Sequence, residues 1–223
     1  TVVDIGKLAG KPVVAVITSM AQPLGTHIGN ALEVKDAIDV LAGRTQGDLL
    51  EISLLLGSHM LVLAEKAKTL PEARAMLENA LSSGAGLRKL AEMIAAQGGD
   101  PRVVEDLSLL PQAAVKRVMR AETAGYLSAM DTTALGMAAQ RMGAGRAKKS
   151  DMLDYSVGYV LHVRLGDEVT EDTPLATLYA KNEAEAEEAE KAIRKALTIA
   201  KEKPSVPPLW DAVVTAEGII YNR

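Results

Sequence analysis

The spacing of apolar positions divides the first hundred residues into one strand and four helices. Residues 13–18, VVAVIT, form a continuous β-branched run without alternation, which is typical of a strand buried on both faces of a parallel sheet. Residues 28–42 carry apolar side chains at helical spacing, and Gly43 ends this helix. Three more helices are predicted at residues 48–66, 70–81 and 86–96, the second of them capped by Thr69.

Beyond a connector at residues 98–112, which is rich in Gly, Pro and acidic side chains, the pattern changes to short strands. A helix capped by Asp131 and a helix from Asn182 to Lys201 interrupt them. We expect a mixed α/β fold with a mostly helical domain at 1–111 and a β-rich domain at 112–223. Strands are predicted within residues 114–120 and 125–130, within 157–169 and 174–180 around a Gly166-Asp167 turn, and in two short terminal segments.

The composition of the chain excludes several classes of partner and of chemistry. Apolar residues make up 48% of the chain, aromatic residues only 3% and Phe is absent, so an aliphatic core is expected. A net charge of −4 argues against a nucleic-acid partner. The absence of Cys excludes disulfide and thiolate chemistry and suits a cytoplasmic protein. No apolar run reaches the roughly 18 residues of a membrane span, so no membrane partner is expected.

The segment SMAQPLGTH, residues 19–27, is the first candidate for a binding loop. It joins the predicted strand at 13–18 to the following helix, a place where ligands bind in open α/β sheets. Glu33 and Asp36 follow at a spacing of three. They fit either charges that complement the helix dipole or, with loop carbonyls, a site for a hard cation. His27 lies in the loop without a second His nearby, which argues against zinc.

The other candidate features have simpler structural explanations. His59 lies on an apolar helix face and is expected to be a satisfied core or interface histidine. His162, in a predicted strand, should point to solvent or a polar contact. MGAGRAKK, residues 142–149, could cradle an anion through backbone N–H groups, but a glycine turn that ends the helix is favoured.

Long motifs distributed along the chain resemble the pyrimidine-nucleoside phosphorylase and thymidine phosphorylase family. The resemblance covers nearly the whole chain, in order, and is to the carboxyl-terminal half of the family's chain. The motifs are AVITSMAQPLGTHIGNALEVKDAI, LGSHMLVLAEKA, MIAAQGGDPRVVED, MDTTALGMAAQRMGAGRAKKSDMLDYSVGYVLHVRLGDEV and PLATLYAKNE.

The resemblance implies phosphorolysis of a pyrimidine nucleoside, uridine or thymidine, with inorganic phosphate as co-substrate. It also implies a cytoplasmic homodimer and a β-rich carboxyl-terminal domain of the barrel-sandwich type. In this family the phosphate loop and the Arg, Ser and Lys that grip the pyrimidine lie upstream. We therefore expect no catalytic or substrate-binding residue in residues 1–223, and no activity from this chain alone.

The resemblance also assigns the candidate loop to a monovalent, potassium-like cation. Carried over, the ligands are the carbonyls of Leu24 and His27 and the carboxylate of Asp36. The remaining ligands would come from the upstream phosphate loop. His27 has an unusual side chain for this position, and Asp36 is shorter than the Glu often found there.

Two alternatives remain open. The first is a related phosphorylase that acts on nucleoside monophosphates. The second is a non-enzymatic carrier or interaction module, because residues 160–180 follow the strand and turn rhythm of biotinyl and lipoyl carrier domains. The usual modified lysine is missing, and Lys148 and Lys149 would be the candidates for modification.

Overall fold

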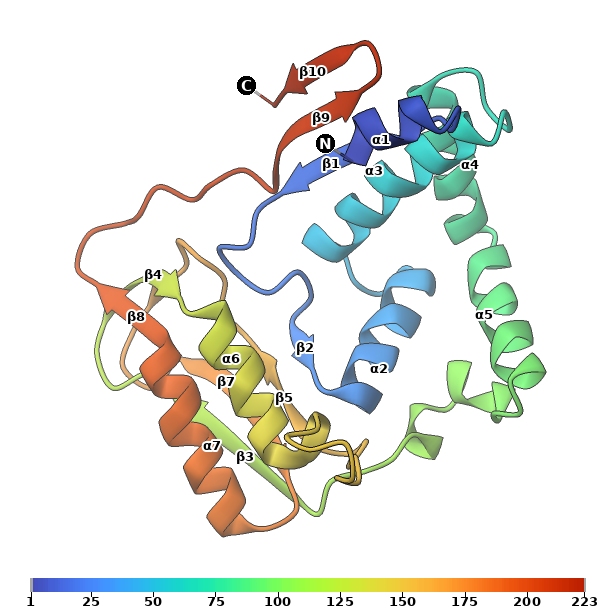
Figure 1. Cartoon of the computed structure of the whole chain (residues 1–223). Coiled ribbons are helices and arrows are strands. Elements are labelled where there is room, and N and C mark those ends of the chain that lie inside the picture. The colour runs from blue at the N-terminus through green and yellow to red at the C-terminus, as the bar shows by residue number, and fades with distance from the viewer. Residues whose placement is uncertain (1, 223) are drawn as a thin grey trace. The chain divides into compact units, whose positions relative to one another are not determined.

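The computed structural model describes residues 2–222, which form two compact units. The first unit contains residues 2–19, 40–89 and 207–222, and the second contains residues 20–39 and 90–206. Helices and strands occur in both (Figure 1), so the predicted mixed α/β class is confirmed. The division into domains at residue 111 stays a prediction. Among the described residues, no helix has the length and apolar character needed to cross a membrane.

The first unit combines helices with a three-stranded antiparallel sheet in the order β1-β9-β10. Val40, Leu50 and Leu54 form a buried apolar cluster against which Leu77 and Leu81 pack. The elements are α1 (Val2–Leu8), β1 (Ala15–Thr18), α3 (Asp48–Leu63), α4 (Leu70–Ser82), the start of α5 (Ala85–Ala96), β9 (Trp210–Thr215) and β10 (Gly218–Tyr221).

The strand predicted at residues 13–18 exists as β1, but its predicted environment is wrong. It pairs antiparallel with β9, not within a parallel sheet, and Ile17 is 48% exposed. A run of β-branched residues indicates a strand, but it cannot identify the partner strand almost 200 residues away in the sequence.

Capping side chains fix the helix starts where the sequence placed them. Thr69 Oγ1 accepts a hydrogen bond from the N–H of Glu72 and so caps α4, and Glu72 Oε2 accepts from the N–H of Lys68, one residue before the cap. Asp131 Oδ1 accepts from the N–H of Ala134 at the start of α6 (Thr132–Ala139). These local predictions are confirmed because a cap depends only on residues within one turn.

The second unit contains two sheets, in the orders β2-β5-β7-β3 and β6-β4-β8. All their pairings are antiparallel, and within residues 2–222 neither sheet closes into a barrel. The strands are β2 (His27–Ile28), β3 (Val115–Arg120), β4 (Gly125–Met130), β5 (Gly158–Leu161), β6 (Glu168–Val169), β7 (Pro174–Ala180) and β8 (Leu197–Ala200). The helices are α2 (Asn30–Leu41), α6 (Thr132–Ala139) and α7 (Glu183–Ala196), with short turns η1 (Pro101–Val104), η2 (Leu107–Leu109) and the π-helical η3 (Gln140–Ala144).

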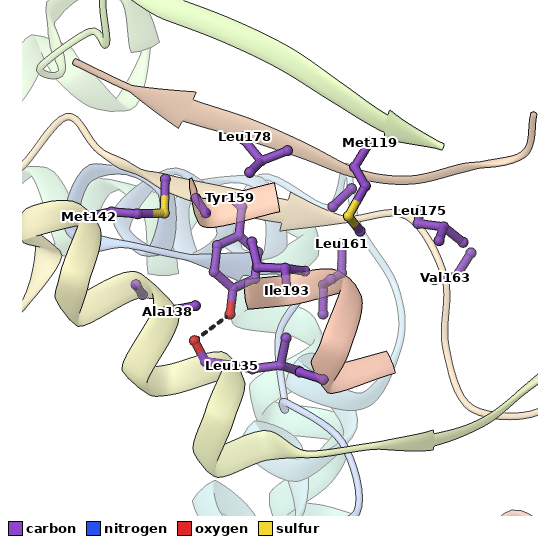
Figure 2. Close-up of a cluster of buried hydrophobic side chains, with 14 of the residues drawn as sticks. Met119, Leu135, Ala138, Met142, Tyr159, Leu161, Val163, Leu175, Leu178 and Ile193 are labelled. Carbon is purple, nitrogen blue, oxygen red and sulfur yellow. Dashed lines mark hydrogen bonds between the residues drawn. The ribbon is translucent and has the colours of Figure 1, made fainter. Parts of the chain in front are cut away.

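Aliphatic side chains from these sheets and from α6 and α7 form one core (Figure 2). Tyr159 of β5 is fully buried in it and donates a hydrogen bond to the carbonyl of Leu135 in α6 (2.8 Å). Burial raises the pKa of the Tyr159 hydroxyl because the phenolate form loses its hydration. This bond satisfies the single polar group of the residue, and so β5 and α6 are held together.

One predicted boundary in this unit is wrong. The helix expected to reach Lys201 ends at Ala196, and residues 197–200 form β8, which pairs with β4. Tertiary pairing overrides the helical continuation of the sequence there. The segment 157–169 contains two strands, β5 and β6, with a turn at Leu165–Gly166 beside the expected Gly166-Asp167 turn, and β5 is buried along its whole length.

Candidate functional site

The predicted binding loop ends at the edge of a sheet, and its residues 20–27 belong to the second unit. Its last part, β2, pairs antiparallel with β5 and places His27 opposite Val160. The N–H of Leu161 donates to the carbonyl of Thr26 (2.8 Å). Bonded and non-bonded pairs alternate along an antiparallel ladder, so the N–H and C=O of His27 point away from β5, toward the open edge.

A contact between two glycines allows β2 to approach β5. Gly29 and Gly158 adopt φ values of 134° and 147°, which L side chains rarely adopt. A Cβ on Gly158 would overlap the carbonyl oxygen of Ile28, and a Cβ on Gly29 would overlap that of Val157. The position of the loop therefore depends on the absence of side chains at this crossing.

A polar clamp after β5 holds the beginning of the same loop. Arg164 donates from Nη1 to the carbonyl of Pro23 (2.7 Å) and from Nη2 to the carbonyl of Leu24 (3.4 Å). The N–H of Leu165 donates to Oε1 of Gln22 (2.9 Å). Charge-assisted hydrogen bonds of this kind fix the direction of backbone carbonyls as well as their position.

The side chains of His27 and Asp36 lie close together. Asp36 is only 4% exposed, and its Oδ1 lies 3.4 Å from Nδ1 of His27. Burial lowers the pKa of His27, and the negative charge of Asp36 opposes this effect only in part. The imidazole therefore favours its neutral form, in which it does not balance a buried carboxylate. Such a carboxylate is stable when a cation or several hydrogen bonds compensate its charge.

The predicted ligand set fits a hard cation. Leu24 and His27 offer carbonyl oxygens, the latter at the open edge of the sheet, and Asp36 offers a buried carboxylate, all of them oxygen donors. No cluster of three or more metal-binding side chains occurs within residues 2–222, so an ion here would need main-chain oxygens. The assignment of Leu24, His27 and Asp36 stays a prediction.

Glu33, the other candidate carboxylate, has a different role from Asp36. Its Oε1 accepts from the N–H of Gly29 (3.2 Å), one of the free donors at the start of α2. This contact supports the helix-dipole interpretation for Glu33. The structure thus gives Glu33 and Asp36 different roles, although their spacing had made them one candidate pair.

Two N–H groups of the glycine loop at residues 142–149 donate to a side chain of the same chain. Gly143 has a φ of 105° and lies in the turn that follows α6, as the glycine-turn prediction required. The N–H groups of Ala147 and Lys148 both donate to Oδ2 of Asp151, at 3.1 and 2.8 Å. An internal carboxylate therefore holds the donors that could have cradled an anion.

The two remaining histidines lie outside the candidate loop. His162 Nε2 lies 2.7 Å from Thr177 Oγ1, which confirms the predicted polar contact. His59 is partly buried in α3, and its Nε2 has no hydrogen-bond partner among the described residues, so the expectation of a histidine satisfied in the core is wrong and the interface alternative stays a prediction. Burial lowers the pKa of His59 and favours the neutral ring.

Sequence reasoning did not find the clamp formed by Arg164 and Gln22. The two residues lie about 140 positions apart, and neither belongs to a motif with a known spacing. The only local signal is a basic residue in the turn after an apolar strand, which is common on protein surfaces.

Comparison with known proteins identifies the family that the chain resembles. Residues 126–200 match the pyrimidine nucleoside phosphorylase C-terminal domain. The pyrimidine-nucleoside phosphorylases of Geobacillus stearothermophilus and Bacillus subtilis (strain 168) are each 49% identical over 181 residues, which is 81% of this chain and 42% of each relative. That of Staphylococcus aureus (strain USA300) is 42% identical over 213 residues, 96% of this chain and 49% of the relative.

The chain thus spans less than half the length of the curated relatives that it matches. The matched domain includes nearly all of β4, then α6, β5, β6, β7 and α7, and ends with β8, so it covers most of the core of the second unit. The domain match and the relatives together show that this chain resembles the carboxyl-terminal half of the pyrimidine-nucleoside phosphorylase family.

Proposed function

We propose that the chain forms the carboxyl-terminal half of an enzyme that phosphorolyses pyrimidine nucleosides. Inorganic phosphate attacks the anomeric carbon, the bond from that carbon to the base nitrogen breaks, and the base leaves as pentose 1-phosphate forms. The observation that carries the proposal is the 42% identity over 213 residues to a protein named pyrimidine-nucleoside phosphorylase. The reaction requires a positioned anion and stabilisation of the charge that develops on the departing base.

The contribution of this chain would be to build and hold one wall of a phosphate site. A monovalent cation, when bound, would supply positive charge that favours the anionic co-substrate. Asp36 provides the buried negative charge for that ion, and Arg164 and Gln22 fix the direction of the loop carbonyls. The groups that touch phosphate and base would come from the part of the protein that precedes this chain.

Release of uracil and thymine tests the proposal. The 223-residue chain and an extended protein that includes the preceding half are each incubated with uridine or thymidine and inorganic phosphate. We expect phosphate-dependent base release from the extended protein and none from the chain alone. Turnover by the chain alone would contradict the upstream location of the catalytic groups, and inactivity of the extended protein would contradict the reaction.

The same assay separates the alternatives. The names of the relatives favour nucleosides, so uridine should be cleaved much faster than uridine monophosphate. The carrier alternative predicts added mass on Lys148 or Lys149, which intact mass spectrometry of protein from its own cells would detect. An unmodified mass is expected if the chain belongs to a phosphorylase.

We infer further that the extended protein is a cytoplasmic homodimer, by analogy with the family. Sedimentation of the extended protein gives the oligomeric state. A monomer at micromolar concentration would contradict this part of the proposal.

A further inference from the structure

A cavity of about 360 Å³ lies within the second unit. None of its lining residues belongs to the candidate cation loop. Its walls come from α2, from the connector around residues 107–113, and from β3 and β7. The polar side chains that line it include Lys35, Lys116, Ser108, Ser156 and Tyr179. We propose that this cavity binds a sugar phosphate, a role separate from the phosphorolysis proposed above.

The charge of the cavity favours an anion. Lys35 and Lys116 both line it, neither forms an ion pair with another described residue, and no carboxylate belongs to its described lining. Nζ of Lys116 lies 5.6 Å from the centre of the Tyr179 ring, which also lines the cavity. Burial lowers the pKa of the nearby His162, and the positive charge of Lys116 lowers it further. An anion bound between the ammonium groups of Lys35 and Lys116 would compensate the positive charges of both lysines.

Two serines provide hydrogen-bond acceptors beside these charges. Ser108 Oγ donates to Asp106 Oδ1 and Ser156 Oγ donates to Asp154 Oδ1, each at 2.6 Å. These bonds hold the pKa of both carboxyl groups below the usual range, so the acids stay ionised and the serines remain the donors. Because the serine protons are committed, the free lone pairs of both oxygens can accept hydrogen bonds from ligand hydroxyl groups.

The apolar part of the wall suits the carbon skeleton of a small polyol. Leu32, Leu107 and Pro111 line the cavity together with the polar groups. A volume of this size lies at the low end of ligand sites, which excludes large substrates. Two cations, hydroxyl acceptors and a limited apolar surface in a small cavity together specify a phosphorylated sugar better than a bare ion or a neutral sugar.

Isothermal titration calorimetry of the 223-residue chain tests the proposal with ribose 5-phosphate, neutral ribose and inorganic phosphate. We expect binding of ribose 5-phosphate, weaker binding of phosphate and no binding of ribose. Lys35→Ala and Lys116→Ala should each reduce the affinity for ribose 5-phosphate about tenfold, the loss expected for one charge-assisted hydrogen bond. Lys191→Ala is the matched control, because it removes a lysine that pairs with Glu187 and Glu188 on α7, and it should change nothing.

Three results would overturn the proposal: no binding of ribose 5-phosphate, full affinity in the Lys35→Ala/Lys116→Ala double variant, or equal affinity for inorganic phosphate and ribose 5-phosphate. Ser108→Ala provides a second test, because Ser108 is exposed and its loss should reduce the preference for ribose 5-phosphate over phosphate without unfolding the chain. Binding needs no turnover, so a failure here and a failure of phosphorolysis are separate results.

Discussion

Two glycine-containing loops of the second unit differ in what they leave available for a ligand. The loop at 20–29 presents backbone carbonyls and the buried carboxylate of Asp36, and its nearest basic partner, His27, favours the neutral form. The loop at 142–151 presents N–H groups, but Asp151 of the same chain accepts two of them. The loops meet at the start of α2, where Nδ2 of Asn30 donates to the carbonyl of Ala144 (2.8 Å).

Glycine content alone therefore does not make a binding site. Both loops contain Gly and polar residues, yet in one of them the chain pairs the N–H donors with Asp151, whereas in the other the buried carboxylate of Asp36 lies beside a histidine that favours its neutral form. A search for sites in such loops should therefore ask which polar groups the chain itself has already paired.

The largest effect is expected from Gly158→Ala, which would push β2 and the first loop away from β5. The new Cβ would overlap the carbonyl of Ile28 at a φ of 147°, so we expect the free energy of unfolding to fall by about 3 kcal/mol or more. Urea denaturation measures the change. Gly218→Ala is the matched control, because its φ is 148° but no atom of residues 2–222 other than its immediate chain neighbours lies within 4 Å of the added Cβ, and it should cost only about 1 kcal/mol. Equal losses would show that the overlap is unimportant.

Asp36→Asn tests the charge of the first loop in the extended protein. Potassium at one hundred times its dissociation constant should stabilise the unmodified protein by about 2.7 kcal/mol relative to choline, and the variant should lose this response. Thermal unfolding in the two salts measures it. Glu33→Gln removes a carboxylate of the same helix that caps Gly29 and should keep the response. A potassium response that survives in Asp36→Asn would reject Asp36 as a ligand.

Arg164→Ala tests whether the clamp sets the direction of the loop carbonyls. Loss of the bonds to Pro23 and Leu24 should lower potassium affinity about tenfold, or about 1.4 kcal/mol, in a potassium titration of the extended protein. Arg164→Lys should restore part of it. Arg120→Ala is the control, because Arg120 also donates to a carbonyl, that of Asp172, and its loss should leave the affinity unchanged. Equal effects of the two alanine variants would indicate a general loss of stability.

Asp151→Ala should make the second loop resemble a binding site. Release of the N–H groups of Ala147 and Lys148 should cost about 1 kcal/mol of stability and allow weak phosphate binding. Phosphate should then shift the NMR signals of these two amides in the variant and leave them unchanged in the parent chain. Asp100→Ala, which removes an exposed carboxylate paired with Arg102, should not create this response. Absence of any shift would mean that the backbone geometry, not Asp151, prevents anion binding.

Local sequence signals predicted the parts of the fold that depend on neighbouring residues. The Thr69 cap and the Asp131 cap are examples, because each acts within one helical turn. The parallel environment of β1 and the helical continuation through residues 197–200 were wrong, because β9 and β4 lie far away in the sequence. A local sequence pattern carries no information on the energy of pairing between distant strands.

The same limit applies to the candidate site. The spacing of His27 and Asp36 placed both near one loop, and the structure brings their side chains to 3.4 Å. The pattern did not separate Glu33 from Asp36, because a spacing of three is compatible with both roles. Arg164 could not be found, because its partners Pro23 and Leu24 contribute only backbone carbonyls, which every residue has.

The two-residue strand β2 also protects the four-stranded sheet from self-association. It forms one edge in the order β2-β5-β7-β3, and its neighbour β5 is an apolar strand buried along its whole length. A recombinant piece that begins at residue 112 would lack β2 and would leave an edge of β5 open to pairing with other molecules. Such a piece should be prone to aggregation, so a stable version of the β-rich region must include residues 20–39.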